Sequence, residues 1–361
     1  MNEDILSYLP FCYFPGIGSY KFSLLISRFG SPNNLLKANF SELVPILGLE
    51  TARKFTRFLE NFNAKKVFED LKGKGISILV KEDRRFPLAI SQIPDPPIGL
   101  FIKGEIGRYD FNNDIFISVV GTRRPTSYGD TVTKMIVSDL SQAGCVIVSG
   151  MALGIDSQAH WSALAEKGNT IAVLGGAVDV PYPYTNSRLY KEILAKGGLI
   201  ISEHPPGYPV YKAQFATRNR LISGISRGVV VIEGASHSGT LITARFAAEQ
   251  GREVFAVPGP ITSYNSYAPN NLIKQGARLT VCAADICDEL GLAVKIGQNN
   301  SKGSDNKELP ILEYLEKQTG NIDDIVKSTG ITINEVSQRL SLLELKGIVE
   351  KSTDGVFYLI R

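Results

Sequence analysis

The sequence predicts an α/β fold: an extended Rossmann-like parallel sheet, with an N-terminal helical module and a C-terminal winged helix. Three observations predict it. From residue 115 to about 290, strand-sized apolar runs alternate with helical segments, which is the pattern of a parallel sheet covered on both faces. Residues 1 to about 70 have apolar positions at helical spacing. Residues 310–361 have the pattern of three helices followed by a hairpin.

Composition agrees with a globular protein of two or three domains. The chain has 361 residues, of which 43% are hydrophobic, and its mean hydropathy is near zero. Its longest unbroken apolar runs are strand-sized, so we expect no membrane span. The first residues, Met1–Asp4, are acidic and lack the pattern of a secretory signal, so we expect a cytoplasmic protein.

Cysteine and histidine usage offers no metal site. The four cysteines, Cys12, Cys145, Cys282 and Cys287, show no metal-like pairing, and the chain has only three histidines. Cys145 lies inside an apolar run, which predicts a buried thiol. We therefore expect a reduced protein that holds neither a metal nor another cofactor.

The N-terminal module, residues 1 to about 70, is predicted to consist of short helices. Two of its turns, Pro15–Gly18 and Ile46–Leu49, place glycine beside apolar residues just before a helical segment. That spacing resembles paired helix-hairpin-helix (SAM-like) units, in which glycine amides at a helix start contact a DNA phosphate. Glu50 replaces the last glycine of the second turn, and a packing module with glycine turns is the alternative.

The main domain, residues 73–290, begins with two strands, Ile76–Val80 and Leu100–Ile102, separated by the helix-breaking cluster Pro94–Pro97. Further strands are predicted at Ile115–Val120, Cys145–Ser149, Thr170–Leu174, Leu199–Ser202, Val229–Glu233, Val254–Val257 and Leu279–Val281. Helices are predicted between them at Gly129–Ala143, Asp156–Lys167, Ser187–Ala195, Arg218–Ile222, Thr240–Gln250 and Asn270–Gln275. In such sheets ligands bind at the carboxyl ends of the strands, so we expect the site in the turns that follow them.

The C-terminal part begins with a polar stretch, residues 291–309, which predicts a linker. A winged helix is then predicted over 310–361, with a hairpin around Asp354-Gly355 and helices at Ile311–Leu315, Ile322–Ser328 and Ile333–Leu345. The third helix has few cations, so protein contact or simple packing is favoured over contact with a DNA groove.

Two stretches of the main domain carry cations without acidic neighbours. Between His204 and Ile232 there are four cations and no carboxylate, and Ile115–Gly129 contains Arg123-Arg124 but no acid. The net charge of +3 is too small to establish nucleic-acid binding, so its distribution is what matters. Cationic, glycine-bearing turns at strand ends predict a site for a polyanion, and for a nucleic acid rather than a cofactor.

The turn Gly121–Arg124 follows the first strand of the alternating region. In a dinucleotide-binding fold this turn carries G-x-G-x-x-G, and the next strand ends at an acid that binds ribose. Here arginines occupy the turn and Ser149-Gly150 ends the next strand, so both positions argue against NAD. An arginine pair suits contacts with the phosphates or bases of an extended strand.

The next turn contains Gly150 and Gly154 and leads to Asp156. The glycines would allow a ligand to approach the backbone closely, and Asp156 is predicted to cap the following helix. The alternative is a tight, capped turn without a ligand.

The basic segment Lys212–Arg220 is the third candidate. Phe215 lies among cations and is suited to stack on an unpaired base, although core packing is the alternative. Of Arg218 and Arg220, one is expected to face the ligand, and the other to form an ion pair with Glu233 or Glu203.

The helix start Ser238-Gly239-Thr240 is the fourth candidate, because a helix N-terminus suits an anion. His237 precedes it and could act as an acid or base, but a single histidine without a partner is a weak indication.

Five motifs occur in order along the main domain: Val119-Val120-Gly121-Thr122-Arg123-Arg124, Ser149-Gly150-x-Ala152-x-Gly154-Ile155-Asp156-x-x-Ala159-His160, Phe215-x-x-Arg218-Asn219-Arg220-x-Ile222-Ser223-Gly224, Ser238-Gly239-Thr240-Leu241-x-Thr243-Ala244 and Val257-Pro258-Gly259. Together they resemble the DprA/Smf family of DNA-processing proteins. The resemblance covers roughly residues 115–290, with weaker support from the modules on either side.

The resemblance implies a homodimer that binds single-stranded DNA cooperatively, protects incoming DNA and delivers it to the RecA recombinase in natural transformation, without catalysis. By position, Arg123 and Lys212 would hold phosphates, Phe215 would meet a base, and Arg218-Asn219-Arg220 would complete the pocket. The predicted nucleic-acid-binding residues are Gly121, Thr122, Arg123, Arg124, Gly150, Gly154, Lys212, Phe215, Arg218, Asn219, Arg220, Ser238, Gly239 and Thr240.

The chain departs from the family pattern at three places. Ala216 stands where the family usually has Pro, Tyr184 where Lys or Glu is common, and Ser266–Asn270 where the family has a glycine-containing segment. These departures affect loop geometry and any DNA contact near Tyr184, rather than the fold.

A nucleotide-processing enzyme is the alternative from another functional class. Cytokinin-activating phosphoribohydrolases, which have a related fold, carry Pro-Gly-Gly-x-Gly-Thr and a catalytic Glu at the corresponding helix start. The segment Glu233–Thr240 shares only Gly-Thr with that motif. A transcription factor acting through the winged helix is disfavoured by the acidic balance of that module.

Overall fold

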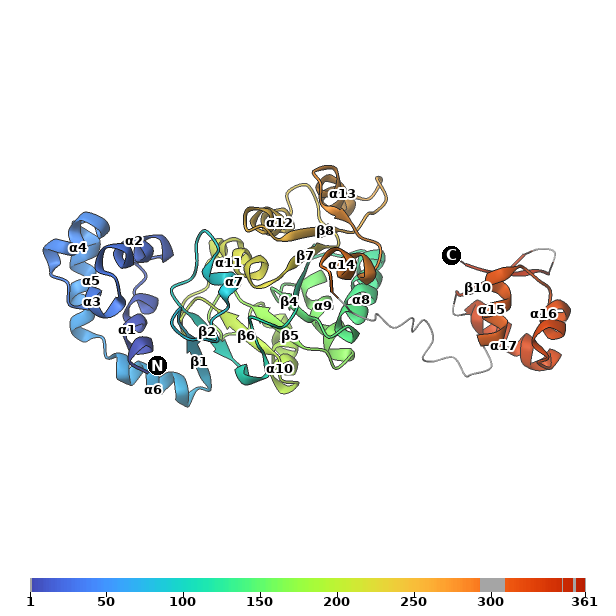
Figure 1. The fold of residues 1–361 in the computed structure, drawn as a ribbon, viewed down its shortest axis with the longest axis horizontal. Helices are drawn as coiled ribbons and strands as arrows, with labels where there is room; N and C mark the ends of the chain where they lie inside the picture. Colours follow the sequence, from blue (N-terminus) through green and yellow to red (C-terminus); the bar gives the residue numbers. More distant parts are fainter. Residues whose placement is uncertain (1, 293–308, 346, 353–354, 361) are drawn as a thin grey trace. The chain divides into compact units, whose positions relative to one another are not determined.

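The computed structural model describes residues 2–292, 309–345, 347–352 and 355–360. Contacts divide the chain into two compact units, residues 1–296 and 297–361. The first contains the N-terminal helices and a large sheet, and the second contains a small helical module with a hairpin (Figure 1).

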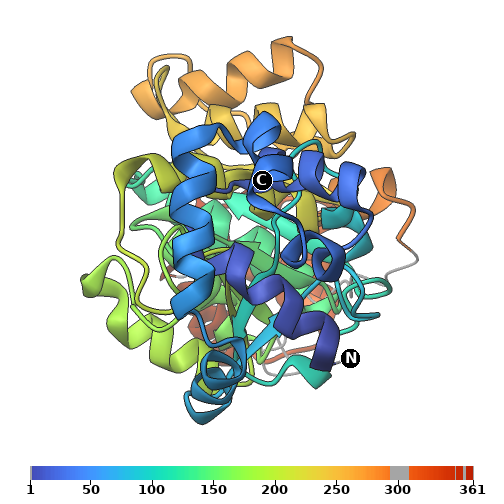
Figure 2. The same cartoon turned by 90° about the vertical axis from the view of Figure 1, so that its left-hand side faces the viewer.

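Short helices form the N-terminal part of the first unit, drawn in blue in Figure 2. They pack around fully buried side chains such as Leu9, Leu25 and Phe55. Tyr8 Oη donates a hydrogen bond of 2.7 Å to Glu82 Oε1, which ties the helices to the segment that follows the first strand. The helices are α1 (Asn2–Tyr13), α2 (Ser19–Phe29), α3 (Pro32–Leu36), α4 (Phe40–Leu47), α5 (Leu49–Asn61) and α6 (Ala64–Gly73).

The sheet of the first unit has nine strands among the described residues, in the order β1-β2-β6-β5-β4-β3-β7-β8-β9. From β6 to β9 every neighbouring pair is parallel, whereas β2 is antiparallel to both β1 and β6. The strands are β1 (Ile76–Leu79), β2 (Leu100–Lys103), β3 (Phe116–Val120), β4 (Val146–Ser149), β5 (Thr170–Val173), β6 (Leu199–Ser202), β7 (Gly228–Val231), β8 (Glu253–Ala256) and β9 (Arg278–Leu279). The predicted Rossmann-like parallel sheet is therefore confirmed.

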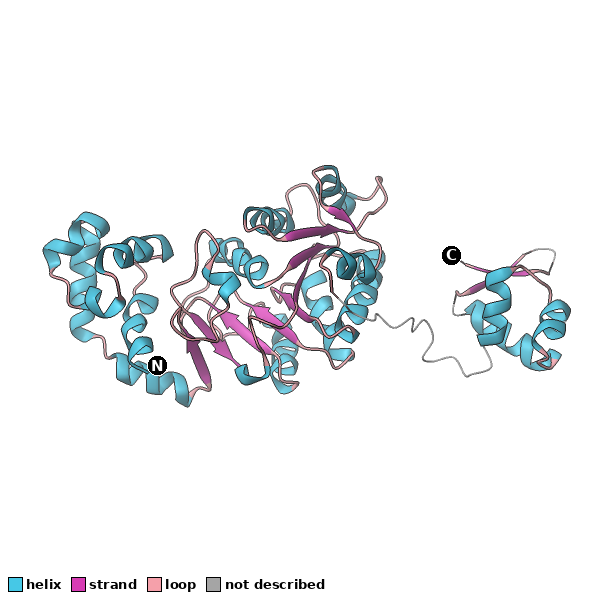
Figure 3. Cartoon of the chain, viewed as in Figure 1, coloured by secondary structure: helices cyan, strands magenta, loops and turns pink. Residues whose placement is uncertain are grey.

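Helices cover both faces of this sheet, as Figure 3 shows. Successive residues of a strand point to opposite faces. Accordingly, Val120 packs in one buried cluster with Leu221 and Ala244, and Val119 in another with Ile136 and Ala159. The helices and short turns are α7 (Leu88–Ser91), η1 (Ile106–Arg108), α8 (Ser127–Gln142), α9 (Ile155–Ala165), η2 (Tyr184–Asn186), α10 (Ser187–Ala195), α11 (Lys212–Ile225), α12 (Gly239–Glu249), η3 (Tyr264–Ser266), α13 (Tyr267–Lys274) and α14 (Ala283–Glu289).

The strand order reverses at β3. The chain runs from β3 through β4 and β5 to β6 on one side, and then returns to β7 on the other side of β3. In an open parallel sheet, the loops diverge at such a point and leave a crevice at the carboxyl ends of the strands. The turns after β3, β4 and β7 are therefore brought together.

Two local predictions were wrong. Helix α11 begins at Lys212 rather than Arg218, because Gln214 Oε1 accepts a hydrogen bond of 2.7 Å from the Tyr211 amide and so stabilises an earlier start. Asp156 does not cap α9: Gly154 occupies the N-cap position, and Asp156 lies in the first turn. Cys145 is 1% exposed, which confirms the predicted buried thiol.

The second unit contains α15 (Leu309–Lys317), α16 (Ile322–Thr329) and α17 (Ile333–Leu345), followed by the hairpin strands β10 (Val349–Lys351) and β11 (Phe357–Leu359). Its core includes Ile311, Ile325, Leu340 and Phe357. The predicted winged helix is confirmed. Residues 293–308 of the predicted linker and Asp354 of the predicted hairpin turn lie outside the described residues.

Among the described helices, none combines the length and the apolar character that crossing a membrane requires.

Candidate nucleic-acid interface

A cavity of about 700 Å³ opens where the turns after β3 and β4 meet the starts of α11 and α12. This main cavity lies at the carboxyl ends of the strands, where the strand order reverses. Its lining residues are Val120, Gly121, Arg123, Ala152, Asp156, Tyr182, Val210, Lys212, Phe215, Ala216, Arg218, Asn219, Ile222, Ser238, Gly239, Thr240, Ile242 and Thr243.

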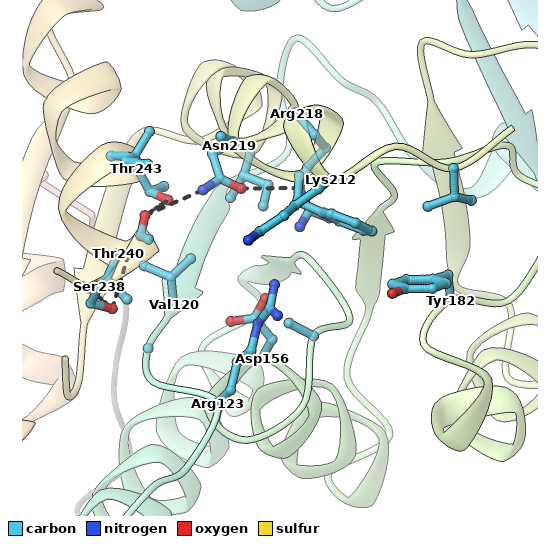
Figure 4. Close-up of a pocket in the computed structure, with 18 residues that line it drawn as sticks. Val120, Arg123, Asp156, Tyr182, Lys212, Arg218, Asn219, Ser238, Thr240 and Thr243 are labelled. Atoms are coloured by element: carbon cyan, nitrogen blue, oxygen red, sulfur yellow. Dashed lines mark hydrogen bonds between the residues drawn. The ribbon is translucent and has the colours of Figure 1, made fainter. Parts of the chain in front are cut away.

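Two exposed cations face the main cavity. Figure 4 shows Lys212 reaching into it from α11 and Arg123 from the turn after β3. Within the part of the chain that the structure describes, neither side chain forms an ion pair. Cations that face a cavity without a carboxylate partner attract anions. The two acid-free stretches of the sequence thus meet at one site.

Arg218 also lines the main cavity but is only 5% exposed. Its Nη1 donates to the carbonyl oxygens of Gly150, at 2.9 Å, and of Val173. Burial lowers the pKa of Arg218 to about 10, although the nearby Asp156 opposes this shift. The side chain therefore remains cationic at neutral pH, and its hydrogen bonds fix its orientation.

Asp156 is the carboxylate of the main cavity and is 6% exposed. Its Oδ2 accepts a hydrogen bond of 3.2 Å from the Gly150 amide. Burial raises the pKa of Asp156, while Arg218 and the backbone amides around it act in the opposite direction. The hydrogen bond between Asp156 and the Gly150 amide thus ties the turn after β4 to the first turn of α9.

Arg220 does not line the main cavity. Its Nη2 donates to Glu203 Oε2 at 2.6 Å, and its Nε to Asp95 Oδ2 at 3.1 Å. Burial alone would lower the pKa of Arg220, but these two carboxylates more than compensate and raise it. Of the two partners considered from the sequence, Glu203 is therefore the real one. The expectation that Arg220 completes the pocket does not fit this geometry.

Phe215 is half-buried on α11 and stacks against Tyr182, with ring centroids 5.0 Å apart and planes inclined by 28°. Tyr182 is 38% exposed and also lines the main cavity. The aromatic surface is therefore a pair of rings and not Phe215 alone. Sequence reasoning missed Tyr182, although its place after β5, at the carboxyl edge of the sheet, could have indicated it.

The start of α12 closes the opposite side of the cavity. Ser238 Oγ accepts a hydrogen bond of 3.3 Å from the Thr240 amide. Asn219 Nδ2 donates to Gly239 O at 3.4 Å, which links α11 to this helix start. The positive end of a helix dipole thus adds to the field of Arg123 and Lys212.

Three of the predicted glycines serve the protein's own packing. A side chain at Gly121 would come within 2.4 Å of the Ile155 side chain. A side chain at Gly150 would come within 2.6 Å of the Arg218 guanidinium. Gly154 has φ 79°, and a side chain there would come within 2.3 Å of Thr122 O. They therefore let other parts of the chain approach, whereas a side chain at Gly239 would meet nothing within 4 Å.

Thr122 and Arg124 line a second cavity of about 500 Å³, which also includes Arg123. His237, considered as an acid or base, is exposed and does not line the main cavity. Within the described residues, no group of His, Cys, Asp and Glu could hold a metal ion.

Comparison with known proteins assigns the chain to a family. A family model described as "DNA recombination-mediator protein A" matches residues 77–291, and one described as "DprA winged helix domain" matches residues 298–355. The chain belongs to the DprA/Smf family. The DNA processing protein DprA of Bacillus subtilis is 38% identical over 73% of this chain and 92% of its own length. Protein Smf of Escherichia coli is 36% identical over 78% of each chain.

Solved DprA structures share the fold. DprA from Streptococcus pneumoniae has a TM-score of 0.68 and 31% identity, over 80% of this chain and 98% of that one. A structure of DprA from Helicobacter pylori, described as giving insights into its single-stranded DNA binding mode, has a TM-score of 0.54 and 29% identity. It covers 61% of this chain and 97% of that one.

Proposed function

We propose that this protein binds single-stranded DNA in the main cavity and carries out no chemistry on it. The observation that carries the proposal is the meeting of Arg123 and Lys212, both exposed and without an ion pair among the described residues, with the stacked pair of Phe215 and Tyr182. A positive groove with aromatic rings is suited to single strands, because phosphates follow the cations while unpaired bases stack on the rings. The relative from Helicobacter pylori, described as binding single-stranded DNA, supports the proposal.

In this proposal Arg123 and Lys212 contact phosphates, together with the start of α12. A base stacks on the aromatic pair. Arg218, which is buried, holds the turn at Gly150 in place and adds positive charge. Duplex DNA keeps its bases paired and stacked on one another, so it cannot use the rings in this way.

The test is fluorescence anisotropy of labelled single-stranded and duplex DNA of equal length, titrated at several salt concentrations. We expect a strong preference for the single strand and a steep dependence on salt. Arg123→Ala and Lys212→Ala should each reduce the slope of log K against log salt by about one, because each removes one phosphate contact. Lys134→Ala, an exposed lysine of α8 outside the main cavity, is the matched control and should leave the slope unchanged.

Affinity that is unchanged in both cavity variants would refute this interface. It would bring the phosphoribohydrolase-like reading of the fold back to the front, to be checked by assaying nucleotide hydrolysis.

We further propose that the protein is a cytoplasmic homodimer that protects incoming strands and delivers them to the RecA recombinase. The description of the matching family as a recombination mediator supports this step. On single strands covered by single-strand-binding protein, the wild type should shorten the lag before RecA hydrolyses ATP, and Lys212→Ala should not. If the wild type binds DNA normally but does not shorten this lag, delivery to RecA is refuted while DNA binding is not. Sedimentation of the free protein as a monomer would refute the dimer.

A further inference from the structure

The second cavity, of about 500 Å³, lies beside the main one and shares Arg123 with it. Its lining residues are Thr122, Arg123, Arg124, Thr126, Ala235, Ser263, Tyr264 and Asn265. Because one side chain borders both cavities, a strand whose phosphate meets Arg123 can continue from the first cavity into the second.

The second cavity is positively charged. It is lined by two exposed arginines and by no carboxylate. The nearby Glu233 is only 2% exposed, and its oxygens accept hydrogen bonds from the Thr126 amide, at 2.9 Å, and from Thr126 Oγ1, at 2.6 Å. That acid is therefore held inside the protein, and within the described residues it forms no ion pair with Arg123 or Arg124.

Tyr264 presents an open aromatic surface at the edge of this cavity. Its side chain is 72% exposed, and within the described residues no other ring stacks on it. An aromatic ring next to unpaired arginines is the combination that binds unpaired bases together with their phosphates.

The loop that carries Tyr264 is held firmly in place. Asn265 Nδ2 donates to Arg124 O at 3.0 Å, and Asn265 O accepts from the Gly234 amide at 2.6 Å. Gly234 O in turn accepts from the Ala268 amide at 2.7 Å. The backbone of this loop is therefore positioned before a ligand arrives, so that little backbone entropy is lost when a base stacks on Tyr264.

We propose that this second cavity is a further subsite for single-stranded DNA, where a nucleotide adjoining those in the main cavity stacks on Tyr264 while its phosphate meets Arg124. The inference rests on the proposed function and extends its footprint. It gives a role to a loop next to a segment in which this chain departs from the family pattern, since only Asn265 separates Tyr264 from Ser266–Asn270.

The test is a length series of oligothymidylates, from about 4 to 20 nucleotides, measured by anisotropy. Tyr264→Ala should weaken binding of the long oligonucleotides by about 5- to 150-fold, the range for loss of one base stack. The same change should not alter the affinity for the shortest oligonucleotides, which fill only the main cavity. Arg124→Ala should act on the same lengths and reduce the salt slope by about one.

Two controls separate stacking from other effects. Tyr264→Phe keeps the ring and should bind like the wild type. Tyr267→Ala removes another exposed tyrosine, 53% exposed, which lines neither cavity and should have no effect. Thermal unfolding of Tyr264→Ala should match the wild type because the side chain is exposed.

Failure of this inference can be told from failure of the main proposal. If Lys212→Ala weakens binding at every length while Tyr264→Ala has no effect at any length, the second subsite is wrong and the main interface stands. If Lys212→Ala has no effect either, the main interface is wrong as well. A change in sedimentation of Tyr264→Ala, with unchanged DNA binding, would show that the ring belongs to a protein contact and would overturn the subsite.

Discussion

Four cations of the main domain divide into two pairs with opposite environments. Arg123 and Lys212 are exposed, face the main cavity and form no ion pair within the described residues. Arg218 and Arg220 are each 5% exposed, and protein carbonyls and carboxylates accept their hydrogen bonds. Arg123 and Lys212, the outer pair, are therefore available to bind an anion. Arg218 and Arg220, the inner pair, stabilise the protein beneath the surface instead.

The comparison shows what an acid-free stretch of sequence does and does not predict. All carboxylates are missing between His204 and Ile232, yet Arg220 is paired in space with Glu203, just outside the stretch, and with Asp95, far away in the sequence. A local lack of acids therefore identifies a region that can be basic. Only the fold decides which of its cations are neutralised.

Among the changes that distinguish the inner pair from the outer pair, Arg220→Ala should cause the largest loss in the free energy of unfolding. Removing one partner of a buried ion pair leaves the other charge uncompensated, at a cost of about 3–5 kcal/mol. We expect a value near the lower end, because the Asp95 side chain is 51% exposed. Denaturant unfolding of the variant and the wild type measures the difference in the free energy of unfolding.

Lys212→Ala is the matched control from the outer pair and should change the free energy of unfolding by less than about 0.5 kcal/mol. Adding Glu203→Gln to Arg220→Ala should recover part of the loss, since it removes the carboxylate left without a partner. Equal losses for Arg220→Ala and Lys212→Ala would contradict the division into an inner and an outer pair.

The sheet was the most predictable part of the molecule. Buried parallel strands leave near-continuous apolar runs, and the predicted strands between residues 115 and 290 correspond to β3 through β9. The turns that matter follow these strands, so Arg123 and the start of α12 were also placed correctly at the carboxyl edge.

What the sequence did not predict depends on contacts between distant segments. The first turn of α11, from Lys212, has no apolar residues at helical spacing that would predict it. It depends instead on the hydrogen bond that the Gln214 side chain accepts from the Tyr211 amide. Tyr182 gains its role only because β5 brings it against Phe215. Gly150 and Gly154 do allow another group to lie close to the backbone, as predicted. That group is the Arg218 side chain or the Thr122 carbonyl of the protein itself rather than a ligand.

The inner environment also includes His160, and its titration gives the next largest effect. Thr170 Oγ1 donates its proton to Ile147 O at 2.8 Å, so at the 2.7 Å contact with His160 Nδ1 the hydroxyl oxygen is the acceptor. Burial, and next the charge of Arg218, lower the pKa of His160 to about 3 from an ordinary value of 6.5. The folded state therefore resists a proton that the unfolded state accepts.

Because the unfolded chain accepts a proton at His160 and the folded protein does not, the free energy of unfolding should decrease as the pH falls from 6.5 toward 3. Above pH 6.5 this effect is absent. Between pH 7 and pH 5 the loss should be about 2 kcal/mol, at about 1.4 kcal/mol per unit below the unfolded pKa. The His160→Asn variant keeps a hydrogen-bond donor for Thr170 but has no group there that titrates. Its free energy of unfolding should therefore decrease less than that of the wild type between pH 7 and pH 5. Identical pH profiles of the two proteins would show that His160 is not the group responsible.

The smallest effect tests how the inner pair is held. Gly150→Ala would place a methyl group within 2.6 Å of the Arg218 guanidinium. The guanidinium is held by hydrogen bonds, but it ends a long side chain that can yield by a small displacement. We therefore expect a loss of about 1 kcal/mol, at the lower end of the range for overpacking. Gly239→Ala is the matched control at the same site, because its methyl group meets nothing within 4 Å. If the Arg218 contacts hold the turn for DNA, Gly150→Ala should also weaken single-strand binding. An affinity of Gly150→Ala equal to that of the wild type would mean that Arg218 does not shape the interface, and Arg123 and Lys212 would then act without the inner pair.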